Sequence, residues 1–360
     1  MQSYRVDGSK KFRLKNFNCE ETGEFKSRHE CIKEFTENLA EINNLQQRLY
    51  AEAKEGIIFV FQAMDAAGKD GAIRAVLSCL SPQGVSETSF KAPTSEELAH
   101  DYLWRFWKAL PKKGDIAIFN RSYYEDVLVA RVHKLYEKQV YADRIDKETI
   151  LDNRYKQIRN FESYLYENNI RVVKIFLNVS KEEQARRFIS RIDTPKKNWK
   201  ISEGDIKERK YWDDYQEAFE TCIYKTAREH SPWYVVPADH KWYARLIISR
   251  IVLESLREIN PQWPVLPKNE MDKLEEYREL LVNEEGVNYV REKRVYPADT
   301  AIQLALEADA EAKRRKDKKK KDKEKKKNLD DKKSKALKVK RKSSVKGMSA
   351  GKKKVAIPKK

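Results

Sequence analysis

The 360-residue chain is long enough to bury a full core, and 37% of its residues are charged, with a net charge of +18. Residues 313–360 hold 25 Lys and Arg against 5 Asp and Glu, whereas the preceding 312 residues hold 50 against 52, so a nearly neutral body carries a polycationic tail. The lack of long apolar runs and of paired cysteine spacings excludes a membrane-spanning or disulfide-stapled protein and favours a cytoplasmic protein without a membrane partner.

The predicted elements alternate between helices and short apolar strands. Residues 1–29 are polar and predict an N-terminal arm, and apolar residues three and four apart predict a long helix over 30–54. Apolar runs predict strands at 56–61, 115–119, 171–179 and 233–237, of which 56–61 and 171–179 are expected to be buried. Residues 85–91 follow a turn at 82–84 and predict a further short strand. Helical spacing predicts helices at 69–80, 95–110, from 123 onward, 146–168, from 181 onward, 203–229 and 241–259. This alternation predicts an α/β sandwich of three layers around a five-stranded parallel sheet.

Beyond Pro261 the sequence changes character. Residues 263–312 predict a looser helical extension, which ends in an apolar stretch near Leu304. Residues 313–360 predict a disordered tail, because a low-complexity segment of like charge buries too little apolar surface to offset the entropy of folding. The main folded domain is therefore expected over residues 30–262.

A strand at 56–61, a loop of small residues, a Gly-Lys pair and a helix follow one another, which is the context of a phosphate-binding loop. The N–H groups that open the helix converge on one spot, and the helix dipole favours an anion there. Lys69 adds a mobile positive charge for a terminal phosphate. The alternative interpretation is an ordinary glycine-containing turn. The loop residues predicted to bind phosphate are Ala66, Ala67, Gly68, Lys69, Asp70 and Gly71.

Two positions depart from the usual phosphate-loop pattern. Ala63 stands where the first glycine is expected, and Asp70 replaces the Ser or Thr that normally reaches Mg²⁺. Asp65 and Asp70 nevertheless supply hard oxygen ligands, so Mg²⁺ is still predicted at this loop, held directly or through water.

A second polar motif, residues 120–126, begins where the strand at 115–119 ends, at the edge where open α/β sheets bind ligands. Arg121 is suited to grip phosphate oxygens with two parallel hydrogen bonds. Glu125 and Asp126 form a carboxylate pair at the start of a helix, for which simple capping is the alternative interpretation.

The third motif is a basic segment, since residues 181–210 hold ten basic against six acidic side chains. Arg187 and Arg191 are four residues apart and share one helix face. The segment predicts a lid, at about 186–215, that closes over transferring phosphate. A solvated basic helix face is the alternative.

Together these motifs resemble the polyphosphate kinase type 2 family over roughly residues 30–262. The resemblance rests on Met64–Gly71, Phe119–Asp126, the Arg187/Arg191 segment and Trp233–Asp239. It implies a P-loop kinase-type fold and transfer of a terminal phosphoryl group between inorganic polyphosphate and a nucleotide, with Mg²⁺, or Mn²⁺ in its place, as the cofactor. Asn120 followed by Tyr123–Asp126 looks like the subgroup that accepts both AMP and ADP.

The resemblance also implies residue roles and partners. The residues implied to act on the transferring phosphate and its acceptor are Asp65, Lys69, Arg121, Asp126, Arg187 and Arg191, with Asp65, Asp70 and Asp126 serving the metal. Further phosphate or nucleotide contacts are expected from Lys91, Asn120, Glu125, Arg131 and Lys200. Adenine nucleotides are the expected substrates, with guanine nucleotides as a second class, and a homo-oligomer, dimer or tetramer, is expected.

Two rival functions stay open at this point. One is an ATP-dependent nucleoside monophosphate kinase on the same fold, which Asp70 and the motif at 120–126 count against. The other is a nucleic-acid-binding protein that acts through its Lys-rich tail by neutralising phosphates, and the same tail is equally suited to other polyanions, polyphosphate included.

Overall fold

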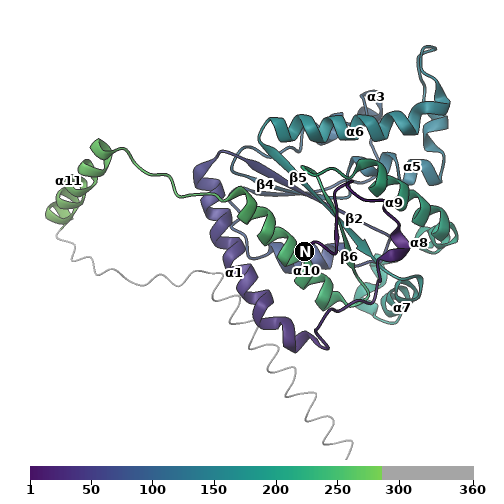
Figure 1. Cartoon of the computed structure of the whole chain (residues 1–360), viewed down its shortest axis with the longest axis horizontal. Helices are drawn as coiled ribbons and strands as arrows, with labels where there is room; N and C mark the ends of the chain where they lie inside the picture. The colour runs from purple at the N-terminus through teal and green to yellow at the C-terminus, as the bar shows by residue number, and fades with distance from the viewer. Residues whose placement is uncertain (286–360) are drawn as a thin grey trace, which may run out of the picture. The chain divides into compact units, whose positions relative to one another are not determined.

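Six strands form one sheet at the centre of the computed structural model, which describes residues 1–285 (Figure 1). The strands are β1 (Arg5–Val6), β2 (Gly56–Ala63), β3 (Val85–Ser89), β4 (Ile116–Asn120), β5 (Ile170–Asn178) and β6 (Trp233–Pro237). Their spatial order is β1-β6-β5-β2-β4-β3. The five predicted strands are confirmed and run parallel, and the arm adds β1 as a sixth strand, antiparallel to β6.

Strand β2 is the centre of the sheet, with β4 on one side and β5 on the other. The side chains from Ile57 to Phe61 are fully buried, because both faces of the sheet are covered by helices. A parallel strand buried on both faces needs apolar residues at every position, which explains its unbroken apolar run. The edge strand β3 instead consists of partly covered and exposed residues.

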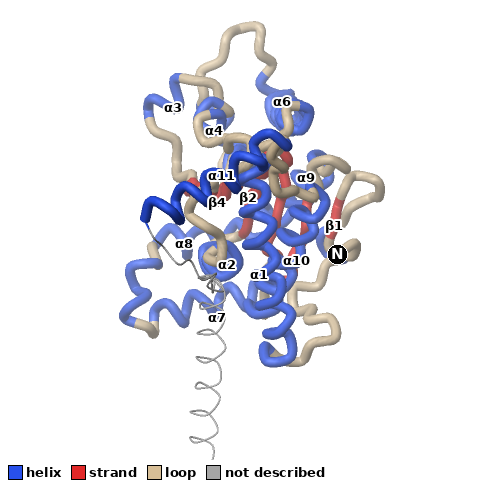
Figure 2. The backbone as a smooth tube through the Cα atoms, turned by 90° about the vertical axis from the view of Figure 1, so that its left-hand side faces the viewer, coloured by secondary structure: helices blue, strands red, loops and turns tan. Residues whose placement is uncertain are grey.

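Helices cover the sheet in two layers, as predicted for a three-layer sandwich. Helices α1 and α10 lie side by side on one face together with α2, and α6 and α9 pack on the other (Figures 1 and 2). The bounds are α1 (Arg28–Glu52), α2 (Lys69–Leu77), α3 (Ser95–Ala99), α4 (Trp104–Trp107), α5 (Val129–Val132), α6 (Ile150–Glu167), α7 (Lys181–Ile192), α8 (Glu203–Glu208), α9 (Trp212–Thr226), α10 (Lys241–Ile259) and α11 (Lys268–Glu285).

Three predicted helices are interrupted. The prediction of one helix over 95–110 is wrong, because Asp101 accepts a hydrogen bond from the Leu103 N–H (2.9 Å) and starts a new turn between α3 and α4. The helix expected from Tyr123 begins as a 3-10 turn, η2 (Tyr123–Asp126), ahead of α5. The helix expected over 203–229 is divided into α8, the 3-10 turn η6 (Arg209–Tyr211) and α9.

The extension and the tail are only partly covered by the structure. Helix α11 falls within the predicted extension, whereas residues 286–360, including the whole Lys-rich tail, lie outside the described residues. Among residues 1–285, no helix has the length and apolar character needed to cross a membrane. All four cysteines are free thiols.

Candidate functional site

The phosphate loop and the second motif meet at one edge of the sheet. Strands β2 and β4 are neighbours with Phe61 opposite Asn120, so the residues that follow each strand emerge side by side. The N–H of Arg121 donates to the carbonyl oxygen of Phe61 (3.1 Å), which ties the second motif to the start of the loop. The expected adjacency of the two motifs is therefore confirmed.

A cavity of about 560 Å³ opens at this edge between the loop, α7, the 3-10 turn η5 (Pro195–Lys200) and the start of α10. Twelve of the residues predicted from sequence line it: Asp65, Ala66, Ala67, Gly68, Lys69, Asp70, Gly71, Asn120, Arg121, Arg187, Arg191 and Lys200. Segments more than a hundred residues apart in sequence thus converge on one space.

The loop reaches this cavity through two residues in the left-handed backbone region. Gly68, the residue before α2, has φ +101°, and Ala66 has φ +60°. A side chain at position 68 would be strained by this backbone, and its Cβ would lie 3.4 Å from Nη1 of Arg187. The glycine therefore permits both the turn and the close approach of α7. The N–H groups of the first turn of α2, which lack intrahelical acceptors, border the cavity.

Lys69 lines the cavity and is partly buried. Loss of hydration on burial, followed by repulsion from Arg121, lowers the pKa of Lys69 to about 8. The nearby carboxylates of Glu125, Asp65 and Asp70 oppose this shift without cancelling it. A lysine held in this way is a charge that an anion in the cavity would stabilise.

Arg121 occupies a strained backbone position, with φ +65°. Its Nη2 donates to Asp65 Oδ1 (3.0 Å), and its Nη1 lies 3.8 Å from Glu125 Oε2. The side chain is still 42% exposed and lines the cavity, so the two carboxylates orient the guanidinium without covering it.

Four predicted site residues do not line this cavity: Lys91, Glu125, Asp126 and Arg131. Glu125 forms an ion pair with Arg121, and Arg131 forms one with Glu217. The carbonyl of Lys91 accepts a hydrogen bond from Arg105 (2.7 Å).

Asp126 lies apart from the other two predicted metal ligands, near Arg154 (3.8 Å). Burial raises the pKa of Asp126 to about 6, although Arg154 and Arg105 oppose the shift. Asp65 and Asp70 both line the cavity, and Asp70 accepts a hydrogen bond from Asn120 (3.3 Å). Within residues 1–285 no group of three or more His, Cys, Asp or Glu side chains is arranged to hold a metal ion. Mg²⁺ commonly uses only one or two carboxylates together with phosphates and water, so Asp65 and Asp70 fit that mode.

The cavity residues that the site prediction does not include are Trp199, Lys241 and Arg245 among others. Trp199 is 78% exposed at the rim. Burial lowers the pKa of both Lys241 and Arg245, with smaller contributions from Arg187 and Arg28 respectively, and Arg245 has no hydrogen-bond or ion-pair partner in the described part of the chain. Their spacing of four residues at the start of α10 is a signal, since it places both on one helix face.

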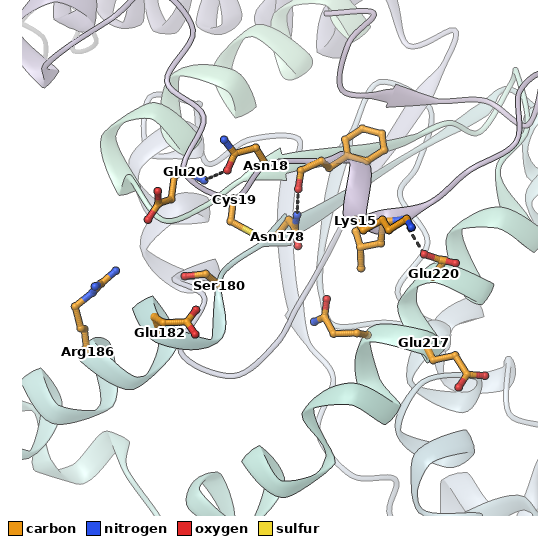
Figure 3. A pocket seen from close by; sticks show the side chains of 13 residues that line it. Lys15, Asn18, Cys19, Glu20, Asn178, Ser180, Glu182, Arg186, Glu217 and Glu220 are labelled. Carbon is orange, nitrogen blue, oxygen red and sulfur yellow. Dashed lines mark hydrogen bonds between the residues drawn. The ribbon is translucent and has the colours of Figure 1, made fainter.

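A second cavity, of about 750 Å³, lies on the other side of α7, between the N-terminal arm and α9 (Figure 3). Its lining mixes both charges, with Glu182 and Arg186 from α7 and Glu217 and Glu220 from α9. Glu220 is already engaged by the N–H of Leu14 (2.8 Å). No predicted site residue lines this space, and the smaller cavity, which gathers the phosphate loop and its cations, is the functional candidate.

Comparison with known proteins gives consistent matches. A family model described as Polyphosphate kinase 2 matches residues 26–264. An ADP-polyphosphate phosphotransferase of Rhodopseudomonas palustris is 46% identical over 256 residues, which are 70% of this chain and 88% of the relative. An AMP/ADP-polyphosphate phosphotransferase of Meiothermus ruber is 43% identical over 265 residues, which are 73% and 96% of the two chains. The crystal structure of polyphosphate kinase 2 from Arthrobacter aurescens TC1 matches with a TM-score of 0.70 and 39% identity, covering 78% of this chain and 96% of that one.

Proposed function

The chain belongs to the polyphosphate kinase 2 family, and we propose that it transfers the terminal phosphoryl group of inorganic polyphosphate to AMP and ADP, giving ADP and ATP. The observation that carries this proposal is the concentration of positive charge around the phosphate loop of a body that is nearly neutral overall. The cations lining the cavity are Lys69, Arg121, Arg187, Arg191, Lys197, Lys200, Lys241 and Arg245.

Charge also determines the mechanism. Polyphosphate and nucleotide are both polyanions, so bringing their reacting ends together costs electrostatic repulsion that the protein has to cancel. Lys69 belongs to the phosphate loop and Arg121 to the second motif, and both line the cavity. This cavity is where the polyphosphate donor and the nucleotide acceptor are proposed to meet. Phosphoryl transfer needs little covalent chemistry from the protein beyond in-line positioning and stabilisation of the negative charge. Residues 186–215 are the proposed lid, and Arg191 and Lys200 of this segment line the cavity.

A divalent cation, Mg²⁺ or Mn²⁺, is the proposed cofactor, and it supplies charge neutralisation between phosphate oxygens when bound. Asp65 and Asp70 are the residues proposed to hold it, since both line the cavity beside Lys69. Asp126 is proposed to act on the acceptor side, where Arg154 and Arg105 surround it.

The names of the relatives support both acceptors, since one is an ADP-polyphosphate and the other an AMP/ADP-polyphosphate phosphotransferase. The deciding experiment incubates purified protein, Mg²⁺ and polyphosphate with AMP, ADP or GDP in separate reactions without ATP. Chromatography then measures the nucleotide products. ADP and ATP from AMP are the expected result, whereas activity with ATP alone as donor would replace this proposal with an ordinary nucleoside monophosphate kinase.

The lowered pKa of Lys69 predicts a loss of polyphosphate affinity in alkaline solution. Below its pKa of about 8 the free enzyme carries the ammonium charge, and polyphosphate binding favours that charged form. As the pH rises through 8 this charge is lost, so affinity is expected to fall, approaching about tenfold per pH unit. Calorimetric titration with tripolyphosphate between pH 7 and 9.5 measures this change in affinity. The Lys69→Arg variant keeps its charge over this range and should show a flatter profile, and equal profiles would contradict the assignment.

The Lys-rich tail is proposed to gather long polyanions, because a segment with 25 basic and 5 acidic residues binds phosphate chains through charge alone. Deleting residues 313–360 is expected to weaken binding of long polyphosphate while turnover with tripolyphosphate stays the same. Titration at several salt concentrations measures this, and equal salt-dependent binding with and without the tail would rule it out. A homo-oligomer and a cytoplasmic location stay predictions, the second in keeping with four free thiols.

A further inference from the structure

Helix α7 lies between the two cavities, and the side chains on one of its faces point toward the phosphate loop. Arg187 and Arg191 line the phosphate cavity, whereas Glu182 and Arg186 line the second cavity (Figure 3). Arg187 is only 5% exposed although it is charged, and Gln184 is 2% exposed. Buried polar side chains of this kind require specific partners.

The partners of Gln184 and Arg187 are consecutive carbonyl oxygens of the phosphate loop. Gln184 Nε2 donates to the oxygen of Asp65 (2.8 Å). Arg187 Nη1 donates to the oxygen of Ala66 (3.3 Å) and, in a shorter contact, to that of Ala67. Two side chains of one helix therefore bind three successive peptide oxygens of the loop.

The other nitrogens of the Arg187 side chain also form hydrogen bonds with the protein. Its Nε donates to Glu183 Oε1 (2.8 Å), and its Nη2 donates to the oxygens of Ala238 and Asp239 (3.1 Å for Asp239) in the segment that joins β6 to α10. Every nitrogen of the side chain is thus bound to protein, in contrast to Arg245, which has no such partner among the described residues.

Binding these oxygens also orients the loop N–H groups. In a trans peptide the C=O of one residue and the N–H of the next point in opposite directions. Holding the oxygens of Asp65 and Ala67 therefore fixes the N–H groups of Ala66 and Gly68. The left-handed backbone of Ala66 (φ +60°) costs free energy for a residue with a Cβ, so contacts from outside the loop are needed to hold this conformation.

We propose that Gln184 and Arg187 are positioning residues that hold the phosphate loop in its anion-binding conformation, and that Arg187 acts through the loop carbonyls and not as a phosphate ligand. Arg209 extends the arrangement, since its Nη1 donates to Gln184 Oε1 (2.5 Å) and so leaves Nε2 for Asp65. The proposal rests on the proposed polyphosphate donor and identifies the residues that prepare its site.

The experiment compares Gln184→Met and Arg187→Lys with the unmodified protein. Methionine keeps the length of the glutamine without its donor, and lysine keeps the charge of the arginine but has too few donors in the required directions. Each variant is expected to raise KM for polyphosphate about tenfold, as loss of hydrogen bonds of this kind implies, with KM for AMP and ADP changed less than about twofold. Calorimetric binding of tripolyphosphate provides a readout that does not depend on turnover.

Arg186→Ala is the matched control, because Arg186 lies one residue away on α7, donates to Glu183 (2.8 Å) and lines the other cavity. It should leave both KM values unchanged. Normal polyphosphate affinity in Gln184→Met would overturn the proposal. If only Arg187→Lys lost polyphosphate affinity, Arg187 would instead be assigned as a direct phosphate ligand. If the unmodified protein neither turns over nor binds polyphosphate, the proposed function fails instead. Thermal unfolding of each variant verifies that it is folded.

Discussion

Replacing Lys69 by methionine is expected to lower kcat/KM for polyphosphate-dependent phosphorylation of AMP and ADP by about 10³-fold or more. Lys69 lines the phosphate cavity, and partial loss of hydration on burial lowers its pKa to about 8. A charge held in this state is stabilised by the phosphoryl group most strongly when negative charge develops during transfer. Methionine has nearly the same length, so the loss reports on charge and not on space.

The measurement is steady-state kinetics with each substrate varied in turn, alongside thermal unfolding. Lys225→Met is a suitable control, because Lys225 belongs to α9 and forms an ion pair with Asp152 away from the cavity. The control should keep full activity. Lys69→Met with activity near that of the unmodified protein would remove Lys69 from the mechanism.

Breaking the buried ion pair between Glu162 and Lys174 is expected to cost about 3–5 kcal/mol of unfolding free energy. Both side chains are completely buried, with Nζ 2.6 Å from Oε2. The hydroxyls of Tyr123 and Tyr124 donate to Oε1 of the same carboxylate (2.9 and 2.7 Å), so removing Glu162 leaves a buried ammonium and two hydroxyls without their acceptor. This network holds the η2 turn, which forms the second half of the second motif.

Urea denaturation of Glu162→Leu, Lys174→Met and the double variant measures the effect. Each single variant leaves one buried charge without its ion-pair partner, whereas the double variant removes both charges and is expected to recover part of the loss. Arg257→Ala is the comparison, since Arg257 pairs with Glu41 at the surface, where ion pairs contribute about 1 kcal/mol or less. A cost as small as that of Arg257→Ala for both single variants would show that the buried pair is not a stabilising unit.

Periodicity was sufficient to predict most of the fold. The apolar run of β2 and the helical spacing of α10 reflect burial that each segment requires wherever it lies, so both were predicted within a few residues. Strand β1 has only two residues and no pattern of its own, and it exists because the edge of β6 is available. The break between α3 and α4 depends on one side chain, Asp101, that competes with the helix for an N–H group.

The candidate site likewise has features that the sequence predicts and features that it does not. The phosphate loop and the second motif were placed side by side from sequence, because polar residues that end neighbouring parallel strands have to meet at one sheet edge. Glu125, Asp126, Lys91 and Arg131 were also predicted at the site but lie outside the cavity lining. Residue type and spacing do not report the direction in which a side chain leaves a turn.

The fold class, the phosphate loop and the family can be predicted before folding is known, since each depends on local pattern and on the order of motifs along the chain. Which cations are free to meet an anion depends on the folded arrangement of the chain. Arg187 and Arg245 are equally basic in sequence, yet Arg187 is bound to carbonyls at positions 66, 67, 238 and 239, and Arg245 is not. Whether a charge is compensated depends on groups brought together from distant segments, and this information exists only after the chain has folded.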